Sequence, residues 1–175
     1  DPAGPERVRQ WVRTALELTG STLDLQHYLM LRLGPYVLGA VFDESISRDP
    51  VQLDGAFVSL FDPSLAVQRH VTLHPGDVAL LYDLNWAREH APLPAVAAAS
   101  TRIRGEVRED GALSFLTRGP VGTVANVQLL VANAPDTIEL TPPVPFEQRY
   151  HAGDGALLLT FENAAADIAV RMEFP

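Results

Sequence analysis

The sequence of 175 residues contains neither cysteine nor lysine, and these two absences exclude several chemistries. Without cysteine the chain has no disulfide, no thiolate nucleophile and no cysteine-based zinc site. Without lysine it has no Schiff-base residue, no P-loop lysine and no attachment point for pyridoxal phosphate. Because a chain of this length buries enough surface to fold without cross-links, the missing cysteines leave the cellular compartment open.

Positive charge is also scarce, since 13 basic residues face 22 acidic ones and the formal net charge is −9. Nucleic acid and anionic membrane surfaces would be repelled over much of such a protein, so we expect neither as the main partner. The longest apolar stretches, 33–42 and 121–134, are too short or too interrupted to cross a bilayer, which takes about 20 residues. We therefore expect no membrane insertion.

The common catalytic and cofactor motifs are missing as well. The sequence has no G-x-S-x-G elbow, no G-x-G-x-x-G fingerprint, no Walker loop and no EF-hand pattern. Its five histidines are scattered without the H-x-H or H-E-x-x-H spacing of metal sites. We expect no cofactor and no metal ion.

Residues 5–19 carry an amphipathic pattern with the helical period. The apolar side consists of Val8, Trp11, Val12, Ala15 and Leu16, and the charged side of Arg7, Arg9, Arg13 and Glu17. The spacing predicts one helix within residues 1–22, either packed on the sheet or serving as a connector to another domain. A β-domain is expected over residues 23–175.

Beyond residue 22 the apolar period changes from about 3.6 to about 2, which predicts strands. Over 23–33, for example, the leucines share one face, while Asp24, Tyr28 and Arg32 lie on the other. Turn residues recur about every 8–12 positions, as in sandwich domains. The sequence therefore predicts an all-β fold, a two-sheet antiparallel β-sandwich of about ten or eleven strands with one N-terminal amphipathic helix.

Two hairpins can be predicted to register. Ile103 and Val107 should share a face with Leu113, which requires a three-residue loop at 109–111 with Gly111 in the left-handed conformation. In the second hairpin, the apolar residues of 157–161 should face those of 168–174 across a loop at 163–167.

Carboxylates and imidazoles supply the candidates for catalysis. A sandwich can hold a glycosidase pair of acids, about 5 to 9.5 Å apart. The acids at strand ends or on strand faces are Asp43, Glu44, Asp83 and Glu106. His70, His74 and Asp77 form the tightest His/Asp cluster, as a candidate general base or metal site. The alternative is that these residues are ordinary turn residues that bond their own backbone.

Arginines and loop aromatics supply the candidates for binding. Arg102, Arg104 and Arg108 alternate along one strand face, and a cationic strip forms if Arg118 pairs near Arg102. Guanidinium groups suit carboxylates such as those of uronic acids. Trp86 and Tyr150 are the aromatics placed to stack on a sugar. The alternatives are a solvated face with internal ion pairs and aromatics that cover the core edge.

Three segments carry a family resemblance: LRLGPYVLGAVFDES, VTLHPGDVALLYDL and GALLLTFENAAADIAVRMEF. In this order they resemble the C-terminal β-sandwich modules of large secreted bacterial proteins that are similar to glycoside hydrolases. The resemblance implies an extracellular or periplasmic location and transfers no active-site residue, because in such proteins the catalytic residues lie in another domain. The N-terminal helix would then be an interdomain connector, and Asp1 a fragment boundary.

The leading hypothesis is a non-catalytic, carbohydrate-associated accessory domain, structural or glycan-binding. Its expected partners are a neighbouring domain or identical subunits, together with a polysaccharide in the binding version. One alternative is a small sandwich hydrolase or lyase that acts on polysaccharide. Another is a self-assembling extracellular surface or filament subunit, in which a second copy completes an edge strand within 23–33 or 168–174.

Overall fold

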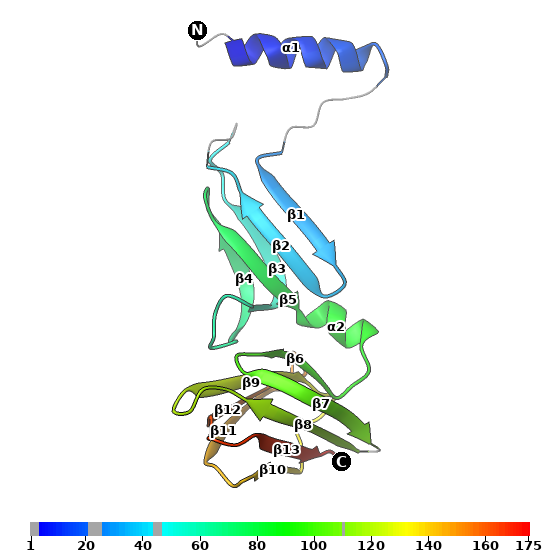
Figure 1. Cartoon of the computed structure of the whole chain (residues 1–175). Helices are drawn as coiled ribbons and strands as arrows, with labels where there is room; N and C mark the ends of the chain where they lie inside the picture. The colour runs from blue at the N-terminus through cyan, green and yellow to red at the C-terminus, as the bar shows by residue number, and fades with distance from the viewer. Residues whose placement is uncertain (1–3, 21–25, 44–46, 110) are drawn as a thin grey trace.

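A computed structural model describes residues 4–20, 26–43, 47–109 and 111–175. The chain is 52% strand and 12% helical, which confirms the all-β prediction. Within the described residues it forms thirteen strands in three antiparallel sheets, where the sequence predicted ten or eleven strands in two (Figure 1). The extra sheet arises because the first five strands build a unit of their own.

The helices and strands have the following bounds. The helices are α1 (Gly4–Glu17) and α2 (Leu84–His90). The strands are β1 (Tyr28–Leu33), β2 (Tyr36–Val41), β3 (Val51–Ser59), β4 (Val67–Leu73), β5 (Val78–Asp83), β6 (Ala95–Ala99), β7 (Arg102–Glu109), β8 (Ala112–Arg118), β9 (Val124–Leu130), β10 (Thr137–Thr141), β11 (Phe146–His151), β12 (Ala156–Glu162) and β13 (Ile168–Glu173). We call β1-β2-β5-β3-β4 the N-terminal sheet, β11-β12-β9-β6 the middle sheet and β10-β13-β8-β7 the outer sheet.

The N-terminal sheet curls around a small core of its own. Apolar side chains from β2, β3, β4 and β5 meet inside the curl, although β2 and β4 are separated by two strands in the sheet. Gly39 marks the closest approach, because a Cβ atom there would lie 2.8 Å from the Leu73 Cδ1 atom on β4. A glycine at this position lets β2 approach β4. The apolar alternation of the sequence slips at Asp54 and Gly55, which predicts a bulge there. The structure has this bulge as a register shift in the pairing of β3 with β4.

The middle and outer sheets pack face to face as the β-sandwich. Their shared core contains fully buried residues such as Leu113 and Met172 from the outer sheet and Val127 and Leu157 from the middle sheet. Alternation along each strand supplies these inward side chains, as the period of two predicts.

The middle sheet is covered on its second face as well. Leu130 and Ala156 point away from the sandwich core and pack against Val58, Tyr82 and Leu84 at the end of the N-terminal sheet and the start of α2. Because both faces are covered, successive residues are buried, namely Val127–Leu130 in β9 and Ala156–Leu157 in β12. The N-terminal sheet thus stands end-on upon the sandwich (Figure 1).

Polar contacts reinforce this junction. The Arg69 guanidinium lies 2.9 Å from the buried Asp154 carboxylate, and the Arg88 guanidinium donates to the Gly153 carbonyl at 3.2 Å. The Asn126 amide donates to the Pro63 carbonyl at 2.9 Å. Each contact joins a residue near the lower end of the N-terminal sheet or in α2 to the sandwich.

The hairpin of β7 and β8 differs from its predicted register. Ile103 pairs with Thr117 as expected, but a bulge follows Arg104. Beyond the bulge, each residue of β7 pairs one position further along β8 than predicted. The loop is therefore two residues long, and Arg108 lies opposite Leu113. Gly105, with φ of +61°, supplies the left-handed conformation that the bulge requires.

The second predicted hairpin is instead a corner between sheets. β12 pairs with β9 and β11, whereas β13 pairs with β8 and β10. Their apolar faces do meet, as the alternation predicts, but across the sandwich core. Side-chain alternation is the same for a hairpin partner and for a strand in the facing sheet, so it could not distinguish the two arrangements.

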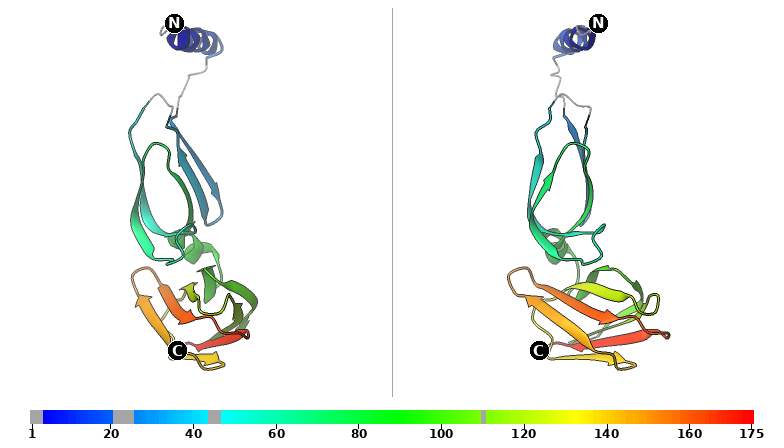
Figure 2. Two further views of the ribbon diagram at one scale, coloured as in Figure 1. Left: turned by 60° about the vertical axis from the view of Figure 1, so that its left-hand side comes forward. Right: turned by 90° about the vertical axis from the view of Figure 1, so that its left-hand side faces the viewer.

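The helices fall where the sequence predicts them. α1 matches the amphipathic segment. The sequence also indicates one helical turn at 85–90, before Pro92 and Pro94, and α2 lies there. Both views in Figure 2 place α1 beyond the far end of the N-terminal sheet. Its apolar side chains are uncovered in this structure, with Trp11 70% exposed and Leu18 85% exposed.

Truncation of Leu130 tests the double burial of the middle sheet. We expect Leu130→Ala to lower the free energy of unfolding by about 2–5 kcal/mol, because it leaves a cavity at the junction. Leu116→Ala, at a partly exposed leucine of the outer sheet, should cost much less. Urea unfolding followed by circular dichroism measures both. Equal losses in the two variants would contradict the three-layer packing.

Tyr82 makes the same junction sensitive to high pH. Burial raises the pKa of the Tyr82 hydroxyl, and the negative charges of Tyr36 and Glu106 act in the same direction. The unfolded chain then loses this proton at a lower pH, about 10, than the folded chain does. The stability contribution is complete below about pH 10 and is lost as the pH rises through the higher folded pKa.

We therefore expect Tyr82→Phe to remove part of the alkaline destabilisation. Urea unfolding at about pH 8 and about pH 11 gives the comparison, since these values lie on either side of the ordinary tyrosine pKa. The free energy of unfolding should fall less for Tyr82→Phe than for the unmodified chain between these two values. An identical fall in both proteins would refute the assignment.

Candidate functional site

The candidate catalytic carboxylates have separate structural tasks. One oxygen of Asp83 caps α2 by accepting from the Trp86 backbone amide at 3.0 Å, and the other lies 2.9 Å from the Arg32 guanidinium. Glu106 is bound by Arg108 on the same strand. Asp43 lies in the exposed segment that follows β2, and Glu44 lies outside the described residues.

The predicted His/Asp cluster is divided in the structure. Asp77 accepts from the His74 backbone amide at 2.8 Å and closes its own turn. The His70 ring instead lies 2.7 Å from Asp54 on the neighbouring strand, where both side chains are exposed. In the described part of the chain, no three histidine or acidic residues lie close enough together to hold a metal ion. The turn interpretation therefore accounts for His74 and Asp77.

The two candidate aromatic residues lie on different elements, Trp86 in α2 and Tyr150 in β11. Trp86 stacks on the His90 ring, with 4.0 Å between centroids and 6° between planes, and it also touches the Gly34 turn. Tyr150 packs against the sandwich core, and its hydroxyl donates to the Ala132 carbonyl at 3.4 Å. The Tyr150 ring therefore covers the edge of the sandwich core, whereas Trp86 is half-buried against His90.

The arginine strip is present in part, on the outer face of the outer sheet. Arg102 lies directly opposite Arg118, which is the pairing that the strip required. Asp167 accepts from both Arg104 and Arg118 and so neutralises much of the strip. Arg108 lies beyond the bulge, where it donates to the Pro94 carbonyl at 2.7 Å. Arg108 therefore links the edges of the two sandwich sheets and does not extend the strip.

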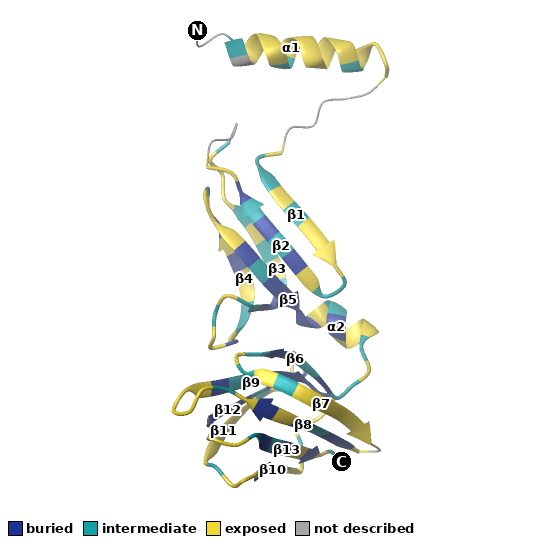
Figure 3. Cartoon of the chain, in the orientation of Figure 1, coloured by how far each residue is buried: buried dark blue, intermediate teal, exposed yellow. Residues whose placement is uncertain are grey.

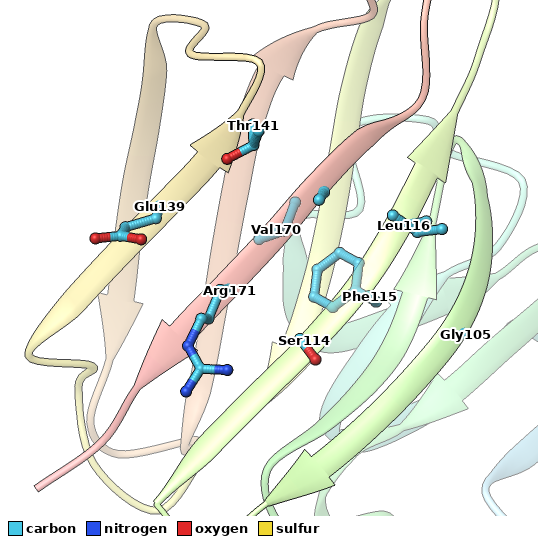
Figure 4. Close-up of a pocket in the computed structure, with 9 residues that line it drawn as sticks. Gly105, Ser114, Phe115, Leu116, Glu139, Thr141, Val170 and Arg171 are labelled. Carbon is cyan, nitrogen blue, oxygen red and sulfur yellow. The ribbon is translucent and has the colours of Figure 1, made fainter.

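A groove of about 420 Å³ lies beside this strip, across four neighbouring strands (Figure 4). We call it the outer-sheet groove. It is lined by Glu139 and Thr141 from β10, Ala169, Val170 and Arg171 from β13, Ser114, Phe115 and Leu116 from β8, and Gly105 from β7. Small residues at 105, 114 and 169 form the floor of the groove, and the larger side chains on either side form its walls.

The chemistry of the outer-sheet groove is mixed. The Ser114 and Thr141 hydroxyls and the Glu139 carboxylate make no hydrogen bond to another side chain or backbone group of the described residues, so they are free for a ligand. Hydrogen bonds to Glu173 and Glu109 raise the pKa of the Arg171 guanidinium, which keeps it charged and oriented. Leu116 and Ala169 add an apolar surface.

Charge in and around the groove is balanced. Among the described residues, the outer face of this sheet and its adjoining loop carry four arginines and four carboxylates. They are Arg102, Arg104, Arg118 and Arg171, with Glu109, Glu139, Asp167 and Glu173. The surface is therefore polar without the net positive charge that the arginines alone suggested.

Sequence reasoning did not select the residues that line the groove. The alternation of apolar residues over 168–174 predicts that Arg171 and Glu173 point to solvent, but short polar residues such as Ser114 and Thr141 carry no motif. A signal was available in the two small residues Ser114 and Ala169 at outward positions. These become adjacent only through the pairing of β8 with β13, which joins segments more than fifty residues apart.

Comparison with protein-family models, with curated protein sequences and with solved structures found no match to this chain. Neither helix of the described chain combines the length and the apolar character that a transmembrane span needs.

Replacement of Asp83 distinguishes a structural carboxylate from a catalytic one. We expect Asp83→Ala to lower the free energy of unfolding by at least about 1 kcal/mol, since α2 loses its cap and Arg32 loses its partner. Asp83→Asn keeps an oxygen that can accept from the Trp86 amide and should lose less. Urea unfolding provides the measurement. Two variants as stable as the unmodified protein would contradict the structural role.

Proposed function

We propose that this chain is a non-catalytic, carbohydrate-associated accessory domain that holds a neutral glycan in the outer-sheet groove. The observation that carries the proposal is the groove itself, in which free hydroxyl and carboxylate groups and the oriented Arg171 guanidinium surround a small apolar surface. Its location outside the cytoplasm rests on the resemblance of the strand and turn sequence to secreted β-sandwich modules.

The groove has the two kinds of group that a sugar ring requires. Sugar hydroxyls both donate and accept, so Glu139 can accept, Arg171 can donate, and the hydroxyl of Ser114 can do either. Charge-assisted hydrogen bonds of this type are among the stronger ones. The apolar faces of the ring would lie against Leu116 and Ala169. The groove lies on rigid paired strands, which keeps these groups in place before a ligand arrives.

A neutral glycan is favoured over an acidic one by the balance of charge. Asp167 already accepts from Arg104 and Arg118, and Glu139 adds a negative charge to the groove. A uronic acid would have to compete with these carboxylates for the arginines. A neutral sugar would bind without displacing them.

Affinity electrophoresis in gels that contain β-glucan, xylan, galactomannan or polygalacturonate tests this proposal. We expect at least one of the three neutral polysaccharides to retard the protein, and polygalacturonate to have no effect. Ala169→Trp, which fills the groove, and Glu139→Ala, which removes an acceptor, should each weaken the retardation at least tenfold. Arg149→Ala is the matched control, because Arg149 is an exposed arginine on β11 of the middle sheet.

Three results would overturn the proposal. The first is an absence of retardation by every polysaccharide, and the second is undiminished retardation of both groove variants. The third is retardation that is lost in Trp86→Ala or Tyr150→Ala but retained in the groove variants, which would place the glycan at the aromatics. Circular dichroism of each variant confirms that a loss of binding is not a loss of fold.

A further inference from the structure

Helix α1 presents an apolar stripe that no other element of the described chain covers. Its members are Val8, Trp11, Val12 and Ala15, with Leu18 just beyond the end of the helix, and each of them is exposed in the structure. A stripe of this kind on a helix of 14 residues normally packs against another element, because a short helix depends on tertiary contacts for its stability.

The N-terminal sheet presents a second uncovered apolar surface, on the face of β1, β2 and β5 that points away from the core of the curl. Strand register aligns three rows across these strands: Leu29, Ala40 and Val78; Leu31, Leu38 and Leu80; Leu33, Tyr36 and Tyr82. We call these nine residues the apolar grid. Tyr82 is buried at the junction, whereas Leu31 is 53% exposed and Leu33 is 81% exposed. Figure 3 shows β1 in the colours of exposed and intermediate residues.

The grid is partly exposed to solvent although its sequence is that of a buried face. Every one of the nine positions is apolar, so the face has the composition of a buried surface, and contiguous exposed patches of this kind mark interaction sites. β1 is also an edge strand of the sheet, which leaves the leucines of its outer face without a neighbour on one side.

The helix and the grid match in size and in charge. A helix of 14 residues is about 21 Å long and about 10 Å wide, and three strands of six residues form a face about 20 Å long and about 10 Å wide. Residues 4–17 contain three arginines and two glutamates, whereas residues 28–83 contain three arginines and seven acidic residues. The helix is therefore slightly basic and the unit that carries the grid is acidic, with Asp77 next to Val78 at one corner of the grid.

The position of α1 indicates which helix covers the grid. Figures 1 and 2 place the helix beyond the end of its own sheet, away from the grid of the same chain. We propose that α1 of one copy docks on the apolar grid of a second copy, and that the second copy returns its helix in the same way. Two equivalent contacts related by a two-fold axis close the assembly as a dimer.

Cysteine pairing tests the exchange directly, because the chain contains no cysteine of its own. Ala15→Cys places a thiol on the apolar stripe, and Ala40→Cys places one on the grid. When the two single variants are mixed under mild oxidation, we expect a disulfide between different chains, visible as a doubled mass without reductant. Ala15→Cys mixed with Ala165→Cys is the control, since Ala165 is an exposed alanine in the loop between β12 and β13.

The double variant Ala15→Cys/Ala40→Cys separates this exchange from folding-back of the helix. An internal disulfide in a monomer would show that α1 covers its own grid and would overturn the proposal. The absence of a mixed disulfide above the level of the Ala165→Cys control would overturn it as well.

Light scattering coupled to size exclusion gives a second test on the cysteine-free protein. We expect a dimer whose dissociation constant rises at least tenfold in Leu31→Asp and is unchanged in Val121→Asp, at an exposed valine of the sandwich. Circular dichroism should be the same for both variants, since neither side chain is buried. A chain that stays monomeric at high concentration, or a Leu31→Asp variant that dimerises as well as the unmodified protein, would overturn the proposal.

Discussion

The double burial of the middle sheet is the constraint on which the rest of the structure depends. Its strands contact the outer sheet with one set of side chains, such as Leu129, and the N-terminal unit with the next, such as Leu130. A sheet with only one covered face would leave the second set in water and would separate the two β-units. Because this sheet lies between two cores, the N-terminal sheet is held end-on (Figure 1). Both the grid and the outer-sheet groove lie on faces that remain open.

The charged residues of this protein mainly form contacts that join one helix or strand to another. Arg69 with Asp154 joins the two units, Arg32 with Asp83 joins a strand to the start of α2, and Arg108 joins the edges of the sandwich sheets. Planar guanidinium groups suit such tasks, since each can bind a carboxylate and a carbonyl together. This use explains why the residues that seem most promising for catalysis in the sequence are mostly engaged in packing and capping. The free polar groups are the short side chains of the groove.

The two open surfaces differ in kind, and the difference separates the two proposals. The outer-sheet groove is polar, balanced in charge and centred on β13 and β8, the two inner strands of its sheet. The apolar grid is flat and lies at the edge of a sheet, and its chemical complement is an amphipathic helix of the same chain. Because the groove and the grid lie on different units, glycan binding and self-association can fail or succeed independently of one another.

The sequence by itself determined the all-β class, the opening helix, α2, the bulge near Asp54 and most strand positions, because these follow from the local period of apolar residues and from turn chemistry. The tertiary structure decided which strands pair. It placed β12 and β13 in different sheets and turned the leucine face of β1 to solvent. It also brought Ser114 beside Ala169. The alternation of apolar and polar residues shows that the two faces of a strand differ, but it does not show which element packs against each face. That depends on contacts between distant segments, which no local pattern records.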